Sequence, residues 1–491
     1  MLFTSFDFII CFLPIVLGVY LLFMRLDLSH LAMPWLALSS LYFYGSNDYR
    51  LLILMLMSLL VNFVVGRLYF IRKRRFILFF GVFFNLFLLG YIKYYGFVGE
   101  ILGLGDVGSS LPLLGISFYT FQQIAWLVDL RKGINFPSFI NYIVFISFFP
   151  QLIAGPIVHH SEMMPQFTRI IGTGKSSYAK KFLSHFRIGL SIFVIGLFKK
   201  VVIADNCALL VTPIFNAASV GMDIGTFSAW AAALAYSMQI YFDFSGYTDM
   251  AVGISRMFGI RLPINFFSPY KSRNIIEFWR RWHMTLSRWL RDYVYIPLGG
   301  NLKGEARRYI NLMITMLVGG LWHGANWSFV VWGGVHGLFL AGNHVWNKYV
   351  GLTTGYFGRF LTFFLVVNAW VLFRAGNYMN DFQTAQNVYG AMYSWKIGSQ
   401  NSTYWFLLLT ICIAFFWPNT CELMNKYHPV IQSTKNGNKN FQVISFLPAH
   451  IIVQRWRPTM IWGVIVGCLA TTYLYTVTRS NAYIEFIYFQ F

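Results

Sequence analysis

Two histidines lie in segments whose other residues are mostly apolar or small, and both could take part in proton transfer. His323 sits in MLVGGLWHGANWSFVVWGGVHG (316–337), between two apolar runs and among small residues. Ionisable groups within membrane spans are rare and functional by default, and imidazole can accept a proton from an attacking hydroxyl at neutral pH. The pattern predicts His323 as a general base, with a polar helix-packing residue as the alternative. His336, in the same block, is a weaker candidate for which we favour packing.

His283 lies in NIIEFWRRWHMTLSRWLRDYVYIPLGGN (274–301), the densest block of charged and aromatic residues. Asn274, followed three residues later by Glu277, is a capping-box variant that predicts a helix start. His283 falls on the apolar side of this helix, either packed among tryptophans or facing a reaction path. The spacing predicts an amphipathic helix at the cytoplasmic interface, whose apolar stripe comprises Trp279, Trp282, Leu286, Trp289, Leu290 and Tyr293.

The arginines of this block lie mainly off the apolar stripe. They either contact solvent and lipid headgroups, the interpretation we favour, or bind the phosphates of an acyl-coenzyme A donor. Arg280 and Arg281, with Trp279 and Trp282, are the candidates for donor binding. The sequence has no G-x-S-x-G elbow, phosphate-binding loop or H-E-x-x-H helix, and nothing indicates a bound metal or cofactor.

The composition predicts that helices in a membrane position these residues. Of 491 residues, 57% are hydrophobic and only 11% charged, against about 25% charged in soluble domains. The bias comes from long apolar runs, which predict an all-α integral membrane protein forming one polytopic domain over 1–491. The five cysteines read as apolar fillers. The net charge of +21 fits the positive-inside rule better than nucleic-acid binding.

Charges at the ends of the apolar runs predict the topology. The cluster Arg72–Arg75 is placed in the cytoplasm, and the loop containing Glu100 and Asp106 outside. The basic stretch 253–308, between a span over 227–243 and the next near 309–323, is also cytoplasmic. We predict about twelve crossings in a bundle of roughly 11–13 helices, with both termini outside.

One apolar segment, Phe139–Val158, cannot be a simple crossing because both of its flanks look cytoplasmic. Pro150 and the pair Gly155-Pro156 break a continuous helix there. The segment therefore predicts a re-entrant hairpin, which is tolerated at membrane depth only where protein or a water-filled cavity surrounds it.

These blocks together resemble the membrane-bound O-acyltransferase family, and more narrowly its bacterial branch that contains the membrane subunit of alginate O-acetylation. The resemblance runs nearly end to end. It is carried by LPLLGISFYTFQQIAWLVDLRKG (111–133), FFPQLIAGPIVHHSEMMPQF (148–167), YFDFSGYTDMAVGI (241–254), NFFSPYKSRNIIEFWRRWHMTLSRWLRDYVYIPLGGN (265–301) and LWHGANWSFVVWGGVHG (321–337).

The resemblance implies an essential intramembrane histidine at His323 and a second signature polar position at His283. We assign Trp322, Asn326 and Gln151 to the substrate path. The family further implies acyl transfer from a cytoplasmic thioester, such as acetyl-CoA, to an acceptor beyond the bacterial inner membrane.

A periplasmic SGNH-hydrolase-like partner commonly completes transfer to the polysaccharide in this family. Alginate is the acceptor we expect. Cellulose, peptidoglycan and teichoic acid are the alternatives within the enzyme class, and a polytopic transporter without chemistry of its own is the rival outside it.

Overall fold

The computed structural model describes the chain except for residues 104–114, 173–176, 352–354, 397–403, 432–455 and 480–491. In the described part helices account for nearly all regular structure, and an isolated bridge joins Pro263 to Ile431. The all-α prediction is confirmed. The loop expected outside around Asp106 lies beyond the described residues.

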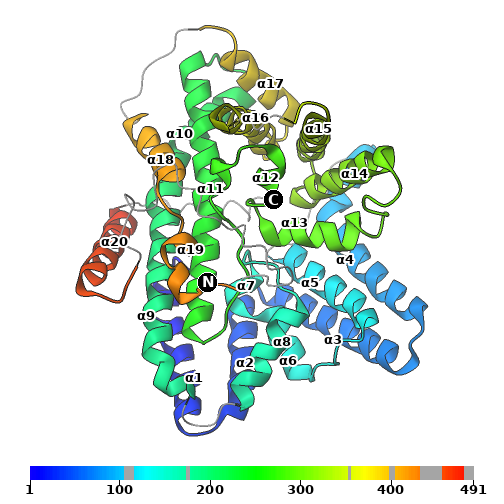
Figure 1. The fold of residues 1–491 in the computed structure, drawn as a ribbon, viewed down its shortest axis with the longest axis vertical. Coiled ribbons are helices and arrows are strands. Elements are labelled where there is room, and N and C mark those ends of the chain that lie inside the picture. The colour runs from blue at the N-terminus through cyan, green and yellow to red at the C-terminus, as the bar shows by residue number, and fades with distance from the viewer. Residues whose placement is uncertain (104–114, 173–176, 352–354, 397–403, 432–455, 480–491) are drawn as a thin grey trace.

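The first half of the chain forms short and long helices up to residue 204 (Figure 1). In chain order they are η1 (Asp7–Phe12), α1 (Leu13–Arg25), η2 (Ser29–Leu31), α2 (Ala32–Gly45), α3 (Tyr49–Arg72), α4 (Arg75–Ile101), α5 (Ile116–Asp129), η3 (Leu130–Lys132), α6 (Phe139–Ser147), α7 (Phe149–Leu152), α8 (His160–Gly172), α9 (Ser177–Leu197) and η4 (Phe198–Ala204).

The second half contains the longest helix and the two blocks that carry the candidate histidines. Its helices are α10 (Asp205–Ser219), α11 (Thr226–Met257), η5 (Pro269–Lys271), α12 (Ile275–Trp279), α13 (Met284–Leu290), η6 (Arg291–Tyr295), α14 (Glu305–His323), α15 (Trp327–Tyr349), α16 (Gly355–Ala375), α17 (Asp381–Met392), α18 (Tyr404–Phe416), α19 (Thr420–Leu423), η7 (Asn425–Tyr427) and α20 (Met460–Arg479).

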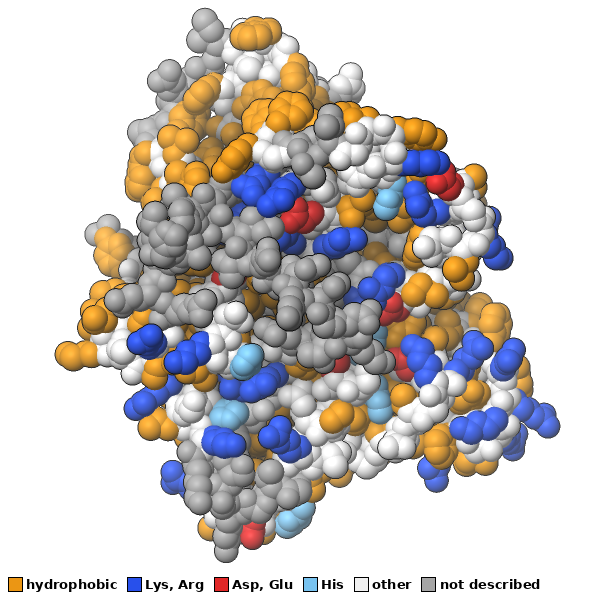
Figure 2. Space-filling model, viewed as in Figure 1, with side chains coloured by type: hydrophobic (Ala, Val, Ile, Leu, Met, Phe, Trp, Pro, Cys, Tyr) orange, Lys and Arg blue, Asp and Glu red, His pale blue; other side chains and the backbone are white. Residues whose placement is uncertain are grey.

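Five helical segments among the described residues are long and apolar enough to cross a membrane: Asp7–Arg25, α3, α4, α16 and Met460–Thr478 of α20. Much of their apolar surface faces outward, and only 6% of the α20 window is buried. In Figure 2 apolar side chains gather along the upper and left margins, while Lys and Arg lie across the middle and lower right. This distribution suits a protein surrounded by lipid, and the larger number of crossings predicted from sequence stays a prediction.

Helix α11 forms the centre of the bundle and is longer than the span predicted over 227–243 (Figure 1). Two aspartates in its second half are buried with partners: Asp243 lies 2.7 Å from Lys200, and Asp249 lies 2.6 Å from Lys199. Buried charges are stable only when paired, so pairing lets the helix continue through the polar stretch to Met257.

The segment predicted to be re-entrant is a broken helix. After α6 the chain turns at Phe148 into the one-turn helix α7, and residues 153–159 are not helical. A nine-residue helix spans only about 14 Å, too short for the roughly 30 Å apolar core of a bilayer. The predicted interruption is confirmed, and its re-entrant path through the membrane stays a prediction.

Candidate active site

His323 is the last residue of α14, where that helix stops. Gly324 has extended backbone angles, φ −165° and ψ 155°, and α15 begins at Trp327. The two helices pack closely at Gly320, because a Cβ atom there would collide with the carbonyl oxygen of Phe329. His323 is 4% exposed. The break that the sequence predicts between two apolar helices is confirmed at this residue.

His283 lies in a turn between α12 and α13, so the single amphipathic helix predicted for this segment is wrong. Its φ of 41° is left-handed, which costs a non-glycine residue about 1–2 kcal/mol. Distant backbone holds the turn: Met284 N–H donates to the Asn265 carbonyl, and Phe267 N–H donates to the Arg281 carbonyl, both at 2.9 Å. The spacing of apolar residues along the segment does not indicate a turn that is stabilised by hydrogen bonds to residues elsewhere in the chain.

Asn265 connects His283 to two further parts of the fold. Its Oδ1 lies 3.1 Å from His283 Nδ1 and accepts the Thr285 hydroxyl at 2.9 Å. That hydroxyl accepts the backbone N–H of Ile157 at 3.1 Å, which brings the broken hairpin to the same place. Sequence reasoning missed Asn265, although it opens one of the family-like motifs. It is a polar residue buried to 1% exposure.

The indole of Trp322 lies beside both candidate histidines. Its ring centroid is 4.9 Å from that of His323 and 6.0 Å from that of His283. The His323 ring also meets Trp332 at 5.3 Å and Phe373 at 5.0 Å. The fold therefore brings the two sequence-predicted catalytic residues together in an aromatic environment from which bulk water is excluded.

A row of aromatic rings leads away from this pair. Trp322 lies 5.4 Å from Phe121, which stacks on Trp289 at 3.7 Å and an angle of 2°. Trp289 lies 5.4 Å from Tyr293, whose hydroxyl donates to Asp129 at 2.9 Å. The row ends in the basic stretch that the charge pattern places in the cytoplasm, and sequence reasoning had not linked Phe121 to it.

The two tryptophans predicted to bind the donor point into the protein. Trp279 Nε1 donates to His336 Nδ1 at 3.3 Å. Trp282 is 2% exposed and packs against Trp370, with centroids 4.9 Å apart. His336 is fully buried in this aromatic cluster, which fits the packing role favoured for it. Donor binding by Trp279 and Trp282 stays a prediction.

The two arginines predicted to bind the donor differ sharply in environment. Arg281 is buried and donates to Glu277 at 2.9 and 3.1 Å and to the Phe267 carbonyl at 3.2 Å. Arg280 is exposed. The helix start is confirmed, since Asn274 accepts the Glu277 N–H at 2.9 Å. Arg281 thus stabilises the fold, and Arg280 is the one of the two arginines that is accessible to an acyl donor.

The other two residues assigned to the substrate path are held by backbone groups. Asn326 donates to the Gly376 carbonyl at 3.1 Å and links the α14–α15 turn to the end of α16. Gln151 is fully buried and donates to the Phe145 carbonyl at 2.8 Å inside the broken hairpin. Their place on a substrate path stays a prediction, whereas Trp322 packs against both histidines.

Lys93 and Tyr94 of α4 bind the end of the helix that carries His323, a contact that sequence reasoning missed. Lys93 Nζ donates to the carbonyls of Trp322 at 2.5 Å and His323 at 3.2 Å. The Tyr94 hydroxyl donates to the Leu321 carbonyl at 2.7 Å. The last carbonyls of a helix lack partners within it, so these donors fix the position of His323. The only signal in the sequence was a lone lysine after an apolar run.

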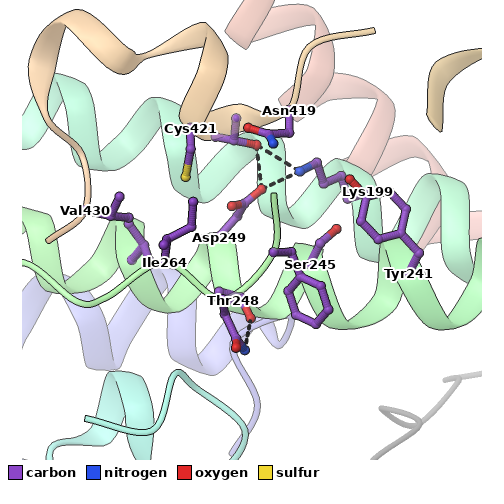
Figure 3. A pocket seen from close by; sticks show the side chains of 13 residues that line it. Lys199, Tyr241, Ser245, Thr248, Asp249, Ile264, Asn419, Cys421 and Val430 are labelled. Carbon is purple, nitrogen blue, oxygen red and sulfur yellow. Dashed lines mark hydrogen bonds and ion pairs between the residues drawn. The ribbon is translucent and has the colours of Figure 1, made fainter. Parts of the chain in front are cut away.

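A second polar cluster lies between α11 and α19, beside a small pocket (Figure 3). Lys199 Nζ contacts Asp249 at 2.6 Å and Thr420 at 2.9 Å, and the Thr420 hydroxyl donates to Asp249 at 2.6 Å. Asn265, the partner of His283, is part of the pocket wall. The cluster therefore fastens α19 to α11 next to the loop that supports His283.

Comparison with known proteins identifies the family that this chain resembles. Residues 41–379 match the model of MBOAT, the membrane-bound O-acyltransferase family. A peptidoglycan O-acetyltransferase of Helicobacter pylori is 40% identical over 433 residues, covering 79% of this chain and 80% of its own. A probable alginate O-acetylase of Pseudomonas putida is 38% identical, covering 82% of each chain. A teichoic acid D-alanyltransferase of Streptococcus thermophilus is 28% identical, covering 56% of this chain and 70% of its own.

Proposed function

Because the chain belongs to the membrane-bound O-acyltransferase family and is therefore a multi-pass membrane acyltransferase, we propose that it moves an acetyl group from a cytoplasmic thioester across the bacterial inner membrane for O-acetylation of a polysaccharide. Acetyl-CoA is the proposed donor. Family membership sets aside a transporter without chemistry. The observation that carries the proposal is the convergence of His323 and His283 on Trp322.

His323 acts as the general base in this proposal. An acceptor hydroxyl attacks the thioester carbonyl carbon, its proton passes to His323, the C–S bond breaks, and the proton is returned to the departing thiolate. Such help contributes about 10²–10⁴-fold in rate. His323 at the end of α14, held by Lys93, has the fixed position that proton transfer needs.

Alginate is the first acceptor we propose, supported by probable alginate O-acetylases among the relatives. Peptidoglycan is the second, supported by the 40% identical relative named for it. A periplasmic SGNH-hydrolase-like partner that completes the transfer is part of the same proposal.

The test compares surface glycans by mass spectrometry in cells with the wild-type protein, without it, and with single variants. We expect acetyl groups to be lost from alginate or from peptidoglycan when the protein is absent. His323→Gln keeps a hydrogen bond but cannot act as a base, so we expect its acetylation to fall by about 10²-fold or more. Near-normal acetylation by folded His323→Gln protein would exclude the base role. His336→Ala is the control, expected to keep substantial activity if it folds, since His336 packs in the neighbouring aromatic cluster.

A further inference from the structure

The hydrogen bonds around Asn265 determine which nitrogen of His283 carries the proton. The Asn265 side chain has a donor end and an acceptor end of nearly equal shape, so their partners must identify them. Thr285 supplies the evidence: its backbone N–H points at one end of the amide, 3.3 Å away. A backbone N–H can only donate, so that end is the oxygen, Oδ1.

The other end of the amide agrees with this assignment. Nδ2 faces the Thr248 hydroxyl on α11 at 3.4 Å, and a hydroxyl oxygen can accept. Oδ1 also takes the Thr285 hydroxyl proton at 2.9 Å. The contacts with Thr285 and Thr248 therefore orient the amide without any assumption about the His283 tautomer.

His283 Nδ1 lies 3.1 Å from this oxygen. Two acceptors cannot form a hydrogen bond with each other, so Nδ1 must carry the hydrogen. A neutral imidazole has only one N–H, and its lone pair is then on Nε2. The contact thus selects one of two tautomers, as partners of metal-bound histidines do.

Burial and neighbouring contacts keep the His283 ring beside Asn265. His283 and Asn265 are 0% and 1% exposed, and the left-handed turn at His283 is tied to the Asn265 backbone through Met284 N–H. The ring packs edge-on against Phe244, with centroids 4.7 Å apart. The side chain of Asn265 therefore holds the His283 ring, and its backbone carbonyl holds the next residue of the same turn, Met284.

We propose that Asn265 is a positioning residue that fixes His283 in the Nδ1–H tautomer, so that Nε2 accepts a hydrogen bond from a hydroxyl on the reaction path. That hydroxyl is a second hydroxyl of the acyl acceptor, because the attacking hydroxyl gives its one proton to His323; this identity rests on the proposed function. In its neutral form His283 then serves as an acceptor beside His323, and cannot use Nε2 to donate to the thioester oxygen. Asn265 acts through His283 and touches no substrate.

The first experiment reads the tautomer directly, without any turnover. Full-length protein with ¹⁵N-labelled histidine in detergent or nanodiscs gives ring nitrogen signals by NMR, and the signals lost in His283→Gln identify that residue. We expect neutral wild-type His283 to be protonated at Nδ1. Protonation at Nε2, or an equal mixture of both tautomers, would overturn the proposal, whatever the protein acetylates.

The second experiment changes the partner. Asn265→Leu removes the acceptor and should release His283 into a mixture of tautomers, whereas Asn265→Asp keeps an oxygen that accepts from Nδ1–H. The matched control is Asn62→Leu, which removes another fully buried asparagine, bonded to Asn85 and Gln123, and should leave the His283 signals unchanged. An unchanged tautomer in folded Asn265→Leu protein would refute the role of Asn265.

Activity then separates this proposal from the proposed function. Acetyl transfer should fall by about 10- to 100-fold in Asn265→Leu, by analogy with the loss when an orienting partner of a metal-bound histidine is removed, and should recover at least in part in Asn265→Asp. Equal loss in two folded variants would argue for a structural role alone. Full activity of His323→Gln would refute the proposed base role of His323. The tautomer of His283 measured by NMR does not depend on that result.

Discussion

Replacing Gly320 with alanine should inactivate the enzyme by moving His323. Gly320 lies one helical turn before His323, and its missing side chain lets α14 approach the backbone of α15. A Cβ atom at Gly320 would overlap the Phe329 carbonyl oxygen and come within 3.1 Å of both Cα and N of Gly333. These are backbone atoms that cannot rotate away, so the helices themselves must separate.

The size of the shift can be worked out from the overlap. Real Cβ atoms essentially never approach a neighbour closer than 3.0 Å, so relief requires the contacting atoms to separate by roughly 0.8 Å. Overpacking of this kind costs about 1–3 kcal/mol. Misplacement of a reacting group by about 1 Å can cost about 10²-fold in rate, and His323 contacts Trp332 across this helix pair. We therefore expect acetyl transfer to fall by roughly 10- to 100-fold.

The matched control is Gly334→Ala on α15. Its Cβ would meet only the Leu317 side chain, at an ordinary 3.5 Å. Both substitutions add the same methyl group to a helix, so their difference isolates the close approach at Gly320. Acetyl transfer and thermal stability of the two purified variants would be measured in the same detergent. Wild-type activity and stability in Gly320→Ala would refute the reasoning that α14 and α15 fix His323 through backbone contact.

Two further perturbations test how the site is held. Arg281→Gln should lower the free energy of unfolding by roughly 1.5–3 kcal/mol, because it breaks buried charged hydrogen bonds to Glu277. Arg280→Gln should unfold like wild type and show a raised KM for the acyl donor. An unchanged KM in Arg280→Gln would favour contact with lipid headgroups instead. Lys93→Met should lower both the melting temperature and the rate of acetyl transfer, because it removes the hydrogen-bond donor to the last carbonyls of α14. Lys93→Arg should restore part of each. Wild-type melting temperature and activity in Lys93→Met would contradict a capping role for Lys93.

The sequence predicts the parts of the site that depend on local pattern. The gap between two apolar runs placed the end of a helix near His323, and Pro150 with the pair Gly155-Pro156 indicated the interruption that follows α6. The pattern was wrong where distant partners decide the outcome. Lys199 and Lys200 neutralise two aspartates of α11, and that helix continues to Met257, beyond the span predicted over 227–243.

The turn at His283 belongs with those failures, because it is held by Asn265, eighteen residues away. Asn265 and Lys93 were missed for the same reason: their importance lies in the residues they contact in the fold, and the sequence alone does not show those contacts.

The two histidines differ in how the fold supports them, and this difference fits different roles. His323 ends a helix whose last carbonyls are held by Lys93, so its backbone is fixed, and its ring packs against Trp322, Trp332 and Phe373. The His283 ring is fixed by the hydrogen bond that its Nδ1–H donates to Asn265 Oδ1. That bond leaves Nε2 as a hydrogen-bond acceptor, so His283 can orient the acyl acceptor while the attacking hydroxyl gives its proton to His323. The proton-transferring role therefore suits His323, and the orienting role suits His283.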